Sequence, residues 1–291
     1  MNPQISIILP TYNEKQEVLA QLIARIETLK MPKLEIIIVD DGSVPSILTQ
    51  EGMRLVRHPH NLGNGAAIKT GARNAKGEIL VFMDADGQHN PQDIPKLLTK
   101  LSEGYDMVIG AREVDSQASL NRRFGNGLLN RLASLMTGYK IEDLTSGFRA
   151  VYANKFRKFL YLLPNGFSYP TTITMAFFRS AYPVAYVPIQ AAKRTGLSKI
   201  KLLKDGLRFF VIILKIGALF SPMRLFLPVS LAFFLIGALY YSYTYFTYGR
   251  FTNMTALLFI ASMLTFLIGI VSEQISTLHY KGTGEDNDRR E

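Results

Sequence analysis

The sequence predicts an α/β domain with a mostly parallel sheet, a juxtamembrane amphipathic helix and two transmembrane helices. Three observations support this fold class: short apolar runs alternate with helical patterns, polar clusters follow the strand ends, and two long charge-free runs lie near the C-terminus. Strands that alternate with helices are typical of parallel sheets with right-handed crossovers. The expected parts are the α/β domain 1–200, the amphipathic helix 201–222, the spans 223–249 and 253–274, and a disordered tail 280–291.

Four buried strands and three helices are expected within the α/β domain. The strands are short apolar runs, and the helices have apolar residues spaced by three and four. The strands cover 5–9, 34–39, 79–83 and 107–110, and the helices cover 14–29, 65–75 and 94–102. In such a sheet, ligands bind at the carboxyl ends of the strands. The polar clusters that follow these strands are therefore the candidate site.

Composition narrows the possible chemistry and partners. The chain of 291 residues has no cysteine, which excludes disulfides and thiolate metal sites. Its four histidines show no zinc-type spacing, so a hard divalent cation, Mg²⁺ or Mn²⁺, is the expected metal. The net charge is +10, and cations are dense between 193 and 215, just before the apolar runs. This placement favours a lipid bilayer over nucleic acid as the partner.

The two apolar runs predict membrane spans. No charged residue occurs from 225 to 249 or from 251 to 272, and each run exceeds the roughly 20 residues that a spanning helix needs. The connecting loop has a single cation, Arg250, whereas the segment before the runs has many. The positive-inside rule therefore predicts that the α/β domain and the C-terminus are cytosolic. The N-terminus lacks the basic region of a signal peptide, which agrees. A buried hairpin of core helices is the alternative.

A pair of carboxylates follows the third predicted strand. Asp84 and Asp86 are separated by one residue, and Gln88 follows them. Mg²⁺ prefers oxygen ligands and often shares its shell with substrate phosphates. Two carboxylates on a turn, with an amide oxygen from Gln88, can hold such an ion while a diphosphate completes its shell. Because the motif is short, taken alone it is better explained by a solvated turn with capping aspartates.

Two further clusters suggest contacts with a nucleotide. Asp40 and Asp41 follow the second strand, where a carboxylate can accept a hydrogen bond from ribose hydroxyls or a base N–H. The turn 61–65, which contains Gly63, precedes the helix with Lys69, and a glycine-rich turn into a helix can approach phosphate. Ordinary turns explain both clusters as well.

Two basic clusters suggest contacts with an anionic acceptor. Arg122, Asn126 and Asn130 are spaced by four, so they share a face if this segment is helical. An arginine with two amides can hold a phosphate, although a solvated polar stripe has the same spacing. The segment 193–199 lies where an anionic headgroup would be, and general membrane-surface charge is its alternative interpretation.

Taken together, the motifs resemble those of family-two glycosyltransferases with the GT-A fold. Within that family they look like the dolichol-phosphate mannosyltransferase and polyprenyl-phosphate glycosyltransferase branch. The resemblance covers roughly residues 4 to 215, and the two-helix tail also fits that branch. The motifs, in order, are Pro10-Thr-Tyr-Asn-Glu14, Val39-Asp-Asp-Gly-Ser43, Asn61-Leu-Gly, Met83-Asp-Ala-Asp-Gly-Gln88, Thr145-Ser-Gly-Phe-Arg149 and Gly196-Leu-Ser-Lys199.

The resemblance implies a role for each matching residue. The expected donor-binding residues are Pro10, Tyr12, Glu14, Asp40 and Asp41, to which we add Gly63 and Lys69. The expected metal ligands are Asp84, Asp86 and Gln88, and the expected catalytic residues are Asp84, Asp86 and Arg112. The expected acceptor-phosphate residues are Arg112, Arg122, Asn126, Lys193, Arg194, Ser198 and Lys199. Asn126 stands where the family commonly has serine, and Lys193 where it commonly has arginine.

The implied reaction is an inverting transfer of a sugar from a nucleotide sugar to a polyprenyl phosphate. GDP-mannose, UDP-glucose and UDP-N-acetylglucosamine are all compatible donors, and a homo-oligomer is compatible with the sequence. Processive polysaccharide synthases carry a Gln-x-x-Arg-Trp motif, which is impossible here because the chain has no tryptophan. A non-catalytic membrane scaffold is a further alternative. A nicotinamide-dependent dehydrogenase is disfavoured by the absence of Gly-x-Gly-x-x-Gly.

Overall fold

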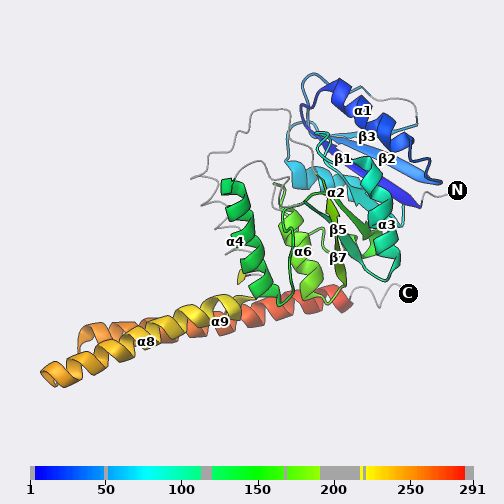
Figure 1. Ribbon diagram of the computed structural model, residues 1–291. Helices are drawn as coiled ribbons and strands as arrows, with labels where there is room; N and C mark the ends of the chain where they lie inside the picture. The colour runs from blue at the N-terminus through cyan, green and yellow to red at the C-terminus, as the bar shows by residue number, and fades with distance from the viewer. Residues whose placement is uncertain are drawn as a thin grey trace. The chain divides into compact units, whose positions relative to one another are not determined.

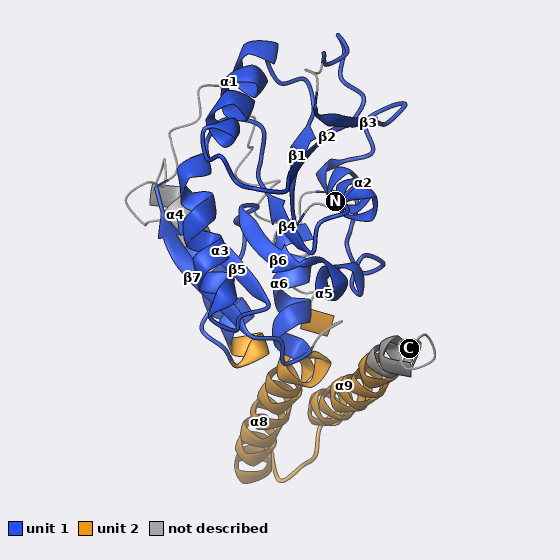
Figure 2. Ribbon diagram, turned by 90° about the vertical axis from the view of Figure 1, so that its right-hand side faces the viewer, with its two compact units in different colours: residues 1–134, 139–201 blue, residues 135–138, 202–291 orange. Residues whose placement is uncertain are grey.

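The computed structural model describes residues 4–48, 52–112, 120–166, 169–190, 217–218 and 221–285. These residues fall into two compact units (Figure 2), one of 1–134 with 139–201 and the other of 135–138 with 202–291. The first unit contains the α/β domain, and the second contains two long apolar helices.

A seven-stranded sheet forms the centre of the first unit (Figure 1). Its order is β3-β2-β1-β4-β6-β5-β7, and all neighbours are parallel except that β6 is antiparallel to β4 and to β5. The mostly parallel α/β sheet predicted from the sequence is thus confirmed. The strands are β1 (Ile5–Thr11), β2 (Leu34–Asp40), β3 (Arg54–Arg57), β4 (Ile79–Phe82), β5 (Met107–Arg112), β6 (Arg149–Tyr152) and β7 (Val184–Ile189).

Helices bury both faces of this sheet. Side chains of α1 and α3 form one core cluster with alternate residues of β1, such as Ile7 and Leu9. The intervening Ile8 points to the opposite face, where it meets Gly71 of α2. The three expected helices are therefore found close to their expected ranges. The helices of this unit are α1 (Gln16–Glu27), α2 (Asn64–Asn74), the 3₁₀ turn η1 (Pro91–Asp93), α3 (Ile94–Ser102), α4 (Leu120–Thr137), α5 (Ala153–Arg157) and α6 (Tyr169–Arg179); α4 ends in the second unit.

Three strands, β3, β6 and β7, were not expected from the sequence. β3 has the short run Arg-Leu-Val-Arg and lies at the edge of the sheet, where only its middle residues are partly buried. β6 begins at Arg149, whose side chain is fully buried. An arginine at a buried strand position interrupts the run of apolar residues on which strand prediction depends.

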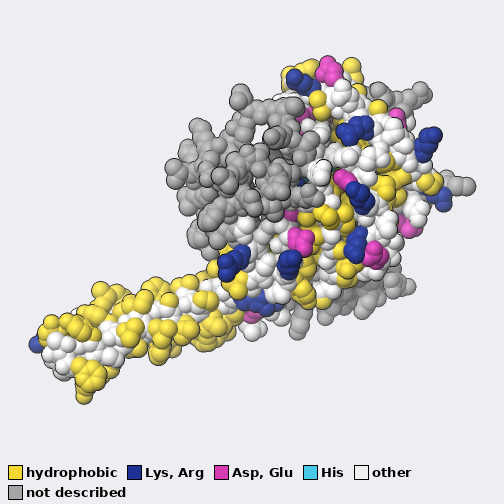
Figure 3. All heavy atoms as spheres, in the orientation of Figure 1, with side chains coloured by type: hydrophobic (Ala, Val, Ile, Leu, Met, Phe, Trp, Pro, Cys, Tyr) yellow, Lys and Arg dark blue, Asp and Glu magenta, His cyan; other side chains and the backbone are white. Residues whose placement is uncertain are grey.

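The second unit is a hairpin of α8 (Pro222–Tyr248) and α9 (Asn253–Glu285). Windows of 18 residues in them reach mean hydropathies of 1.9 and 2.4, so both helices are long and apolar enough to cross a membrane. Large apolar side chains cover the visible face of the hairpin (Figure 3). α9 extends to Glu285 and includes the start of the segment 280–291 that we expected to be disordered. The amphipathic helix expected over 201–222 falls almost wholly outside the described residues.

Small and polar residues bring the two long helices together. Ser230 and Ser262 each donate a hydrogen bond to the other's carbonyl oxygen, both at 2.9 Å. At Gly237, an added Cβ would lie 3.2 Å from Leu258 and Phe259, so a larger residue would push the helices apart. Such small residues and reciprocal hydroxyl contacts are common between membrane helices.

Candidate active site

The polar clusters of the sequence meet at one edge of the sheet. β1 pairs in parallel with β2, with Thr11 opposite Asp40, and with β4, with Ile8 opposite Phe82. The residues that follow these strands therefore leave the sheet in the same direction. Tyr12, Asp41 and Asp84 lie near the start of three neighbouring loops at the carboxyl edge, where ligands bind in parallel sheets.

Asp40 is a buried carboxylate that is occupied by protein donors. Its Oδ1 accepts a hydrogen bond from the Ser43 amide at 2.9 Å, and its Oδ2 accepts one from Arg57 Nε at 2.9 Å. Burial raises the pKa of Asp40, but the bonds from Ser43 and Arg57 outweigh it and hold that pKa below its ordinary value. The carboxylate stays ionised and orders the turn that follows β2.

Asp41 holds a second loop in the same way. Its carboxylate accepts hydrogen bonds from the amides of Leu62 at 2.9 Å and Gly63 at 2.8 Å, and it lies 2.7 Å from His58 Nδ1. The other ring nitrogen of His58 lies 2.9 Å from Thr70 Oγ1 on α2. Asp41 is 3% exposed. These contacts give it a structural role, and its predicted contact with a nucleoside stays a prediction.

The glycine-rich turn packs against another loop of the protein. A Cβ added at Gly63 would lie 2.4 Å from the Asn165 carbonyl oxygen, and one at Gly65 would lie 2.0 Å from that of Pro164. Lys69 Nζ donates to the Leu163 carbonyl at 3.1 Å and to the Asn165 side chain. Close packing with the 163–166 loop thus accounts for Gly63 and Lys69 without a donor phosphate, and the expected phosphate contact stays a prediction.

The loop after β1 presents an aromatic side chain. Tyr12 is 48% exposed, whereas Pro10 is buried and Glu14 is half-buried. Asn13, at φ 53°, joins this loop to the one after β2: its amide donates to Ser43 Oγ, and its side-chain oxygen accepts from the Val44 amide, both at 2.9 Å. Tyr12 is therefore an exposed ring on a firmly held loop.

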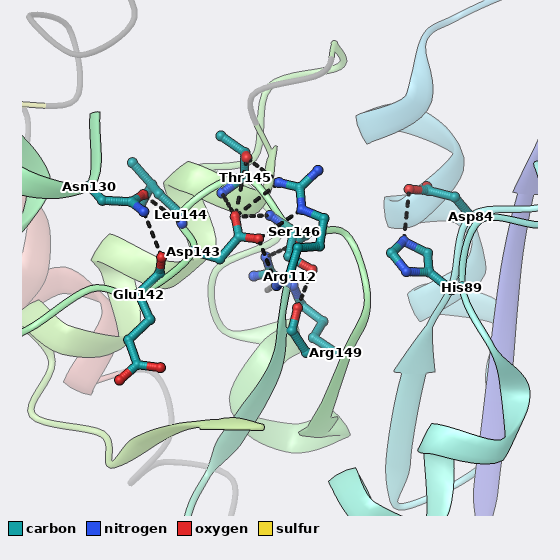
Figure 4. Close-up of polar contacts among 11 residues, drawn as sticks. Asp84, His89, Arg112, Asn130, Glu142, Asp143, Leu144, Thr145, Ser146 and Arg149 are labelled. Atoms are coloured by element: carbon teal, nitrogen blue, oxygen red, sulfur yellow. Dashed lines mark hydrogen bonds and ion pairs between the residues drawn. The ribbon is translucent and has the colours of Figure 1, made fainter. Parts of the chain in front are cut away.

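Asp84 is a partly exposed carboxylate at this edge. Its side chain is 38% exposed, and Nε2 of the buried His89 lies 3.8 Å from its Oδ2 (Figure 4). Burial raises the pKa of Asp84, but His89 and the charges of Arg112 and Arg149 outweigh it, so this pKa lies below its ordinary value. Nearby, the backbone N–H of Gln88 donates a hydrogen bond to Asp86 Oδ1 at 3.1 Å, which closes the turn.

The residues around Asp84 suit a hard divalent cation. Gly147 faces this carboxylate, and a Cβ added there would lie 3.0 Å from Asp84 Oδ2 and 3.4 Å from Oδ1. The glycine thus keeps space beside an ionised and partly exposed carboxylate. The described residues contain no cluster of three or more acidic or histidine ligands. A cation here would need further oxygen ligands, for example from a diphosphate.

Arg112, at the end of β5, forms an ion pair with Asp143. Its Nε and Nη2 donate to the two carboxylate oxygens at 2.8 and 3.0 Å, and Nη2 also donates to Thr145 Oγ1 at 2.6 Å. Burial lowers the pKa of Arg112, but the hydrogen bond and charge of Asp143 outweigh it and raise that pKa. Arg112 keeps 28% of its side chain exposed. It is therefore a fixed cation that stays partly open.

Arg149 is fully buried beneath the same loop. It donates to the carbonyl oxygens of Ser146 and Pro170 and to the Thr174 hydroxyl. Burial lowers the pKa of Arg149, as expected for a cation removed from water. This network fixes the Thr145-Ser-Gly-Phe-Arg149 motif against α6, so Arg149 supports the site from below.

The structure changes the interpretation of Asn130. We expected its amide to share a phosphate-binding stripe with Arg122 and Asn126. Instead, Asn130 Nδ2 donates to the Glu142 carbonyl at 2.6 Å, and Oδ1 accepts from the Leu144 amide at 3.0 Å. Both ends of its side chain are thus occupied by the backbone on either side of Asp143.

Several expected acceptor residues are not described by the structure. The described part of the chain does not include the side chains of Arg122 and Asn126. It also does not include the residues Lys193, Arg194, Ser198 and Lys199. Their roles stay predictions.

Other residues of the site were missed. His58, His89 and Asp143 were not assigned a role, and neither was Gly147, the third residue of a motif that we had noticed. His89 follows Gln88 directly, and this proximity to the carboxylate pair was the available signal.

Comparison with known proteins places these features in a family. Residues 6–160 match the model of Glycosyl transferase family 2, and residues 221–278 match that of the GtrB C-terminal hairpin. The dolichol-phosphate mannosyltransferase of Pyrococcus furiosus is 32% identical over 163 residues, 51% of this chain and 46% of that protein. The undecaprenyl-phosphate 4-deoxy-4-formamido-L-arabinose transferase of Edwardsiella ictaluri is 30% identical over 213 residues, 69% of this chain and 64% of that protein. This chain thus spans about half to two thirds of these relatives' length.

A solved structure shows the same fold. Glucosyl-3-phosphoglycerate synthase from Mycobacterium tuberculosis, in complex with Mn²⁺, uridine diphosphate and phosphoglyceric acid, superposes with a TM-score of 0.58. The match covers 74% of this chain and 78% of that one at 20% sequence identity, which establishes the GT-A-like α/β fold. Since the family model also covers more than half of the sequence, this chain belongs to glycosyl transferase family 2.

Proposed function

We propose that this protein transfers a sugar, with inversion, from a nucleotide diphosphate sugar to a polyprenyl phosphate at the cytosolic membrane face. One observation carries the proposal: a family-two glycosyltransferase domain and a GtrB-type hairpin occur in the same chain. Both relatives described above are named for transfer to a lipid-linked phosphate. A transferase with a polyprenyl acceptor needs its site next to a bilayer, and the hairpin would supply this anchor.

The donor would bind along the carboxyl edge of the sheet. Asp84, Asp86 and Gln88 would hold a Mg²⁺ or Mn²⁺ ion, which would stabilise the negative charge of the departing nucleoside diphosphate. The exposed ring of Tyr12 would contact the nucleoside, together with Pro10 and Glu14. Asp40 and Asp41 would shape this pocket through the loops that they order, and Asp41 would also face the nucleoside.

The acceptor phosphate would be the nucleophile. Its oxygen would form a bond to the anomeric carbon while the bond from that carbon to the diphosphate oxygen breaks, and the nucleoside diphosphate would leave. A phosphate monoester has a second pKa near ~6 and is mostly a dianion at neutral pH, so it needs little help from a general base.

The protein would bring these two anions together with fixed cations. Arg112 is held by Asp143 and partly open, as such a role requires. Arg122 and Asn126 of α4 and the cations of 193–199 would complete the acceptor site.

The distribution of charges supports one membrane orientation. Arg250 is the single cation of the connecting loop, whereas many cations precede α8, so both termini and the transferase domain would face the cytosol. A tag at the C-terminus should resist protease added to intact cells and should be cleaved after the membrane is opened. Cleavage in intact cells would reverse this topology.

The direct test is a transfer assay with the full chain. The purified protein would be incubated with a panel of nucleotide sugars, Mn²⁺ or Mg²⁺ and a polyprenyl phosphate, and the lipid would be analysed by mass spectrometry. The proposal predicts a polyprenyl phosphate that carries one sugar, formed from one donor of the panel. If no donor gave a product while the protein still bound polyprenyl phosphate, the scaffold alternative would be favoured.

A further inference from the structure

A short hydrogen-bonded clip joins α4 to the loop that holds Arg112. As described above, the Asn130 amide binds the backbone of Glu142 and Leu144. One turn later, Ser134 Oγ accepts a hydrogen bond from the Ile141 amide at 2.9 Å. Two side chains of α4, spaced by four residues, thus grip the segment 141–144 at three backbone positions. We call this arrangement the α4 clip.

The gripped segment contains the partner of Arg112. Asp143 lies between the two backbone groups that Asn130 binds, and its carboxylate receives both guanidinium bonds from Arg112. Asp143 Oδ1 also accepts from the amides of Thr145 and Ser146, each at 3.1 Å. Figure 4 shows the continuous chain of contacts from Asn130 through the segment 142–144 to Arg112. A shift of α4 against this segment would therefore move Asp143 and the cation that it orients.

From this geometry we infer that Asn130 is a positioning residue, which holds Arg112 in register with α4 for binding of the anionic acceptor. The inference rests on the proposed function, because it is the polyprenyl phosphate that would meet both elements. Asn130 would act through the protein backbone and would not touch the phosphate, unlike the phosphate contact expected from the sequence.

The amide group of asparagine suits this task. It offers a donor and an acceptor on one planar group, and here the donor faces a carbonyl and the acceptor faces an N–H. Aspartate has the same shape but would place a second acceptor against the Glu142 carbonyl. Alanine would remove both bonds and leave the Glu142 carbonyl and the Leu144 amide without this partner.

A matched asparagine elsewhere in the domain provides the control. Asn74, at the end of α2, also uses both ends of its amide: Nδ2 donates to the Thr70 carbonyl, and Oδ1 accepts from Arg54 Nη2, both at 2.9 Å. It lies in the first unit, and no catalytic or binding role is assigned to it. Asn74→Ala therefore removes a comparable pair of bonds without disturbing the α4 clip.

The experiment compares Asn130→Ala, Asn130→Asp and Asn74→Ala in the full chain in nanodiscs. Three quantities are measured: the KM for polyprenyl phosphate, the Kd of the nucleotide sugar by calorimetry, and the exchange of backbone amide hydrogens in 141–146 without substrate. Asn130→Ala loses both hydrogen bonds, and Asn130→Asp loses the donated one and places an acceptor against the Glu142 carbonyl, so we expect an acceptor KM raised about tenfold in each variant. Donor Kd should stay within about twofold, exchange in 141–146 should speed up, and Asn74→Ala should resemble the wild type in all three.

Ser134→Ala is the milder variant, used if the Asn130 variants fold poorly. It removes one of the three bonds and should raise the acceptor KM about threefold. An acceptor KM that is unchanged in every α4 clip variant, or a donor Kd that changes as much as the acceptor KM, would overturn the inference. If the wild type made no lipid product, the proposed function would fail separately. Amide exchange would then still decide whether the clip exists, and equal rates in wild type and Asn130→Ala would reject it.

Discussion

Two pairs of aspartates stand at the same edge of the sheet and have opposite surroundings. Asp40 and Asp41, at the end of β2, are 0% and 3% exposed, and their carboxylates accept hydrogen bonds from backbone amides and from Arg57. Asp84, after β4, is 38% exposed and has His89 at 3.8 Å. Both pairs consist of aspartates at the carboxyl end of a strand. Burial and the protein donors around each carboxylate therefore distinguish the pair that orders the loops from the pair that we propose binds the metal.

The largest effect is expected at the open pair. Asp86→Asn removes a negative charge from the proposed metal site, and turnover should fall by about 10²-fold or more, as when a preorganised charge-stabilising group is lost. Thermal stability should stay close to that of the wild type. Glu103→Gln, at an exposed carboxylate paired with Lys100 on the surface, should leave activity unchanged. Full activity of the wild type in excess chelator would contradict the metal assignment.

The next effect concerns the acceptor side of the site. An arginine that faces a dianionic phosphate makes a charge-assisted contact of about 2–3 kcal/mol, so Arg122→Ala should cost roughly 30- to 150-fold in the acceptor-dependent step. Arg122→Lys should recover part of this loss, because lysine keeps the charge but lacks the planar fork. Donor affinity, measured by calorimetry, should hardly change. The assignment would be wrong if donor binding weakened and acceptor kinetics stayed the same.

Substitutions in the buried pair, Asp40 and Asp41, should lower the stability of the fold. Asp41→Ala leaves the buried amides of Leu62 and Gly63 and the ring of His58 without their shared acceptor. We expect a loss of about 3 kcal/mol, which corresponds to roughly 6–12 °C in the midpoint of thermal unfolding. Asp86→Asn, measured beside it, should shift the midpoint far less. Equal shifts for the two variants would remove the contrast between the pairs.

The smallest effect is a pH dependence from the Arg112–Asp143 pair. Burial raises the pKa of Asp143, but the hydrogen bonds and charge of Arg112 outweigh it and hold that pKa below its ordinary value. A depressed carboxyl pKa stabilises the fold above the unfolded value of about 3.9, and this stability is lost as pH falls through the folded pKa.

Wild type should therefore exceed Asp143→Asn in stability by about 1 kcal/mol more at pH 6 than at pH 3. Urea unfolding at both pH values measures this difference. A constant gap between the two proteins would show that the Asp143 charge does not contribute.

Sequence patterns predicted the strands and helices that have strong apolar periodicity. The elements found near their expected ranges are buried along their whole length or on one face only. They are the strands β1, β2, β4 and β5 and the helices α1 to α3. β6 was missed because its first residue is the buried Arg149, whose partners include Pro170 and Thr174 of α6, 21 and 25 positions further along. A local window cannot see such partners.

The sequence predicted which residues lie near the site better than it predicted the role of each residue. The motifs correctly indicated which loops meet, since parallel strands bring their carboxyl ends together. They could not separate Asp41 from Asp84, because the difference lies in donors supplied by Leu62, Gly63 and His58. Asn130 shows the same limit: spacing placed it on a face of α4, and only the fold reveals the backbone of 142–144 beside it.

Binding of Mn²⁺ with a nucleoside diphosphate tests the contrast between the two aspartate pairs most directly. The full chain would be titrated with Mn²⁺ by electron paramagnetic resonance in the presence of UDP or GDP, for wild type, Asp86→Asn and Asp40→Asn. We predict that Asp86→Asn loses nucleotide-dependent Mn²⁺ binding while it unfolds at the wild-type temperature. We also predict that Asp40→Asn, where folded, keeps this binding but unfolds at a lower temperature. Mn²⁺ binding that survived in Asp86→Asn and vanished in folded Asp40→Asn would contradict the proposed roles of the two pairs.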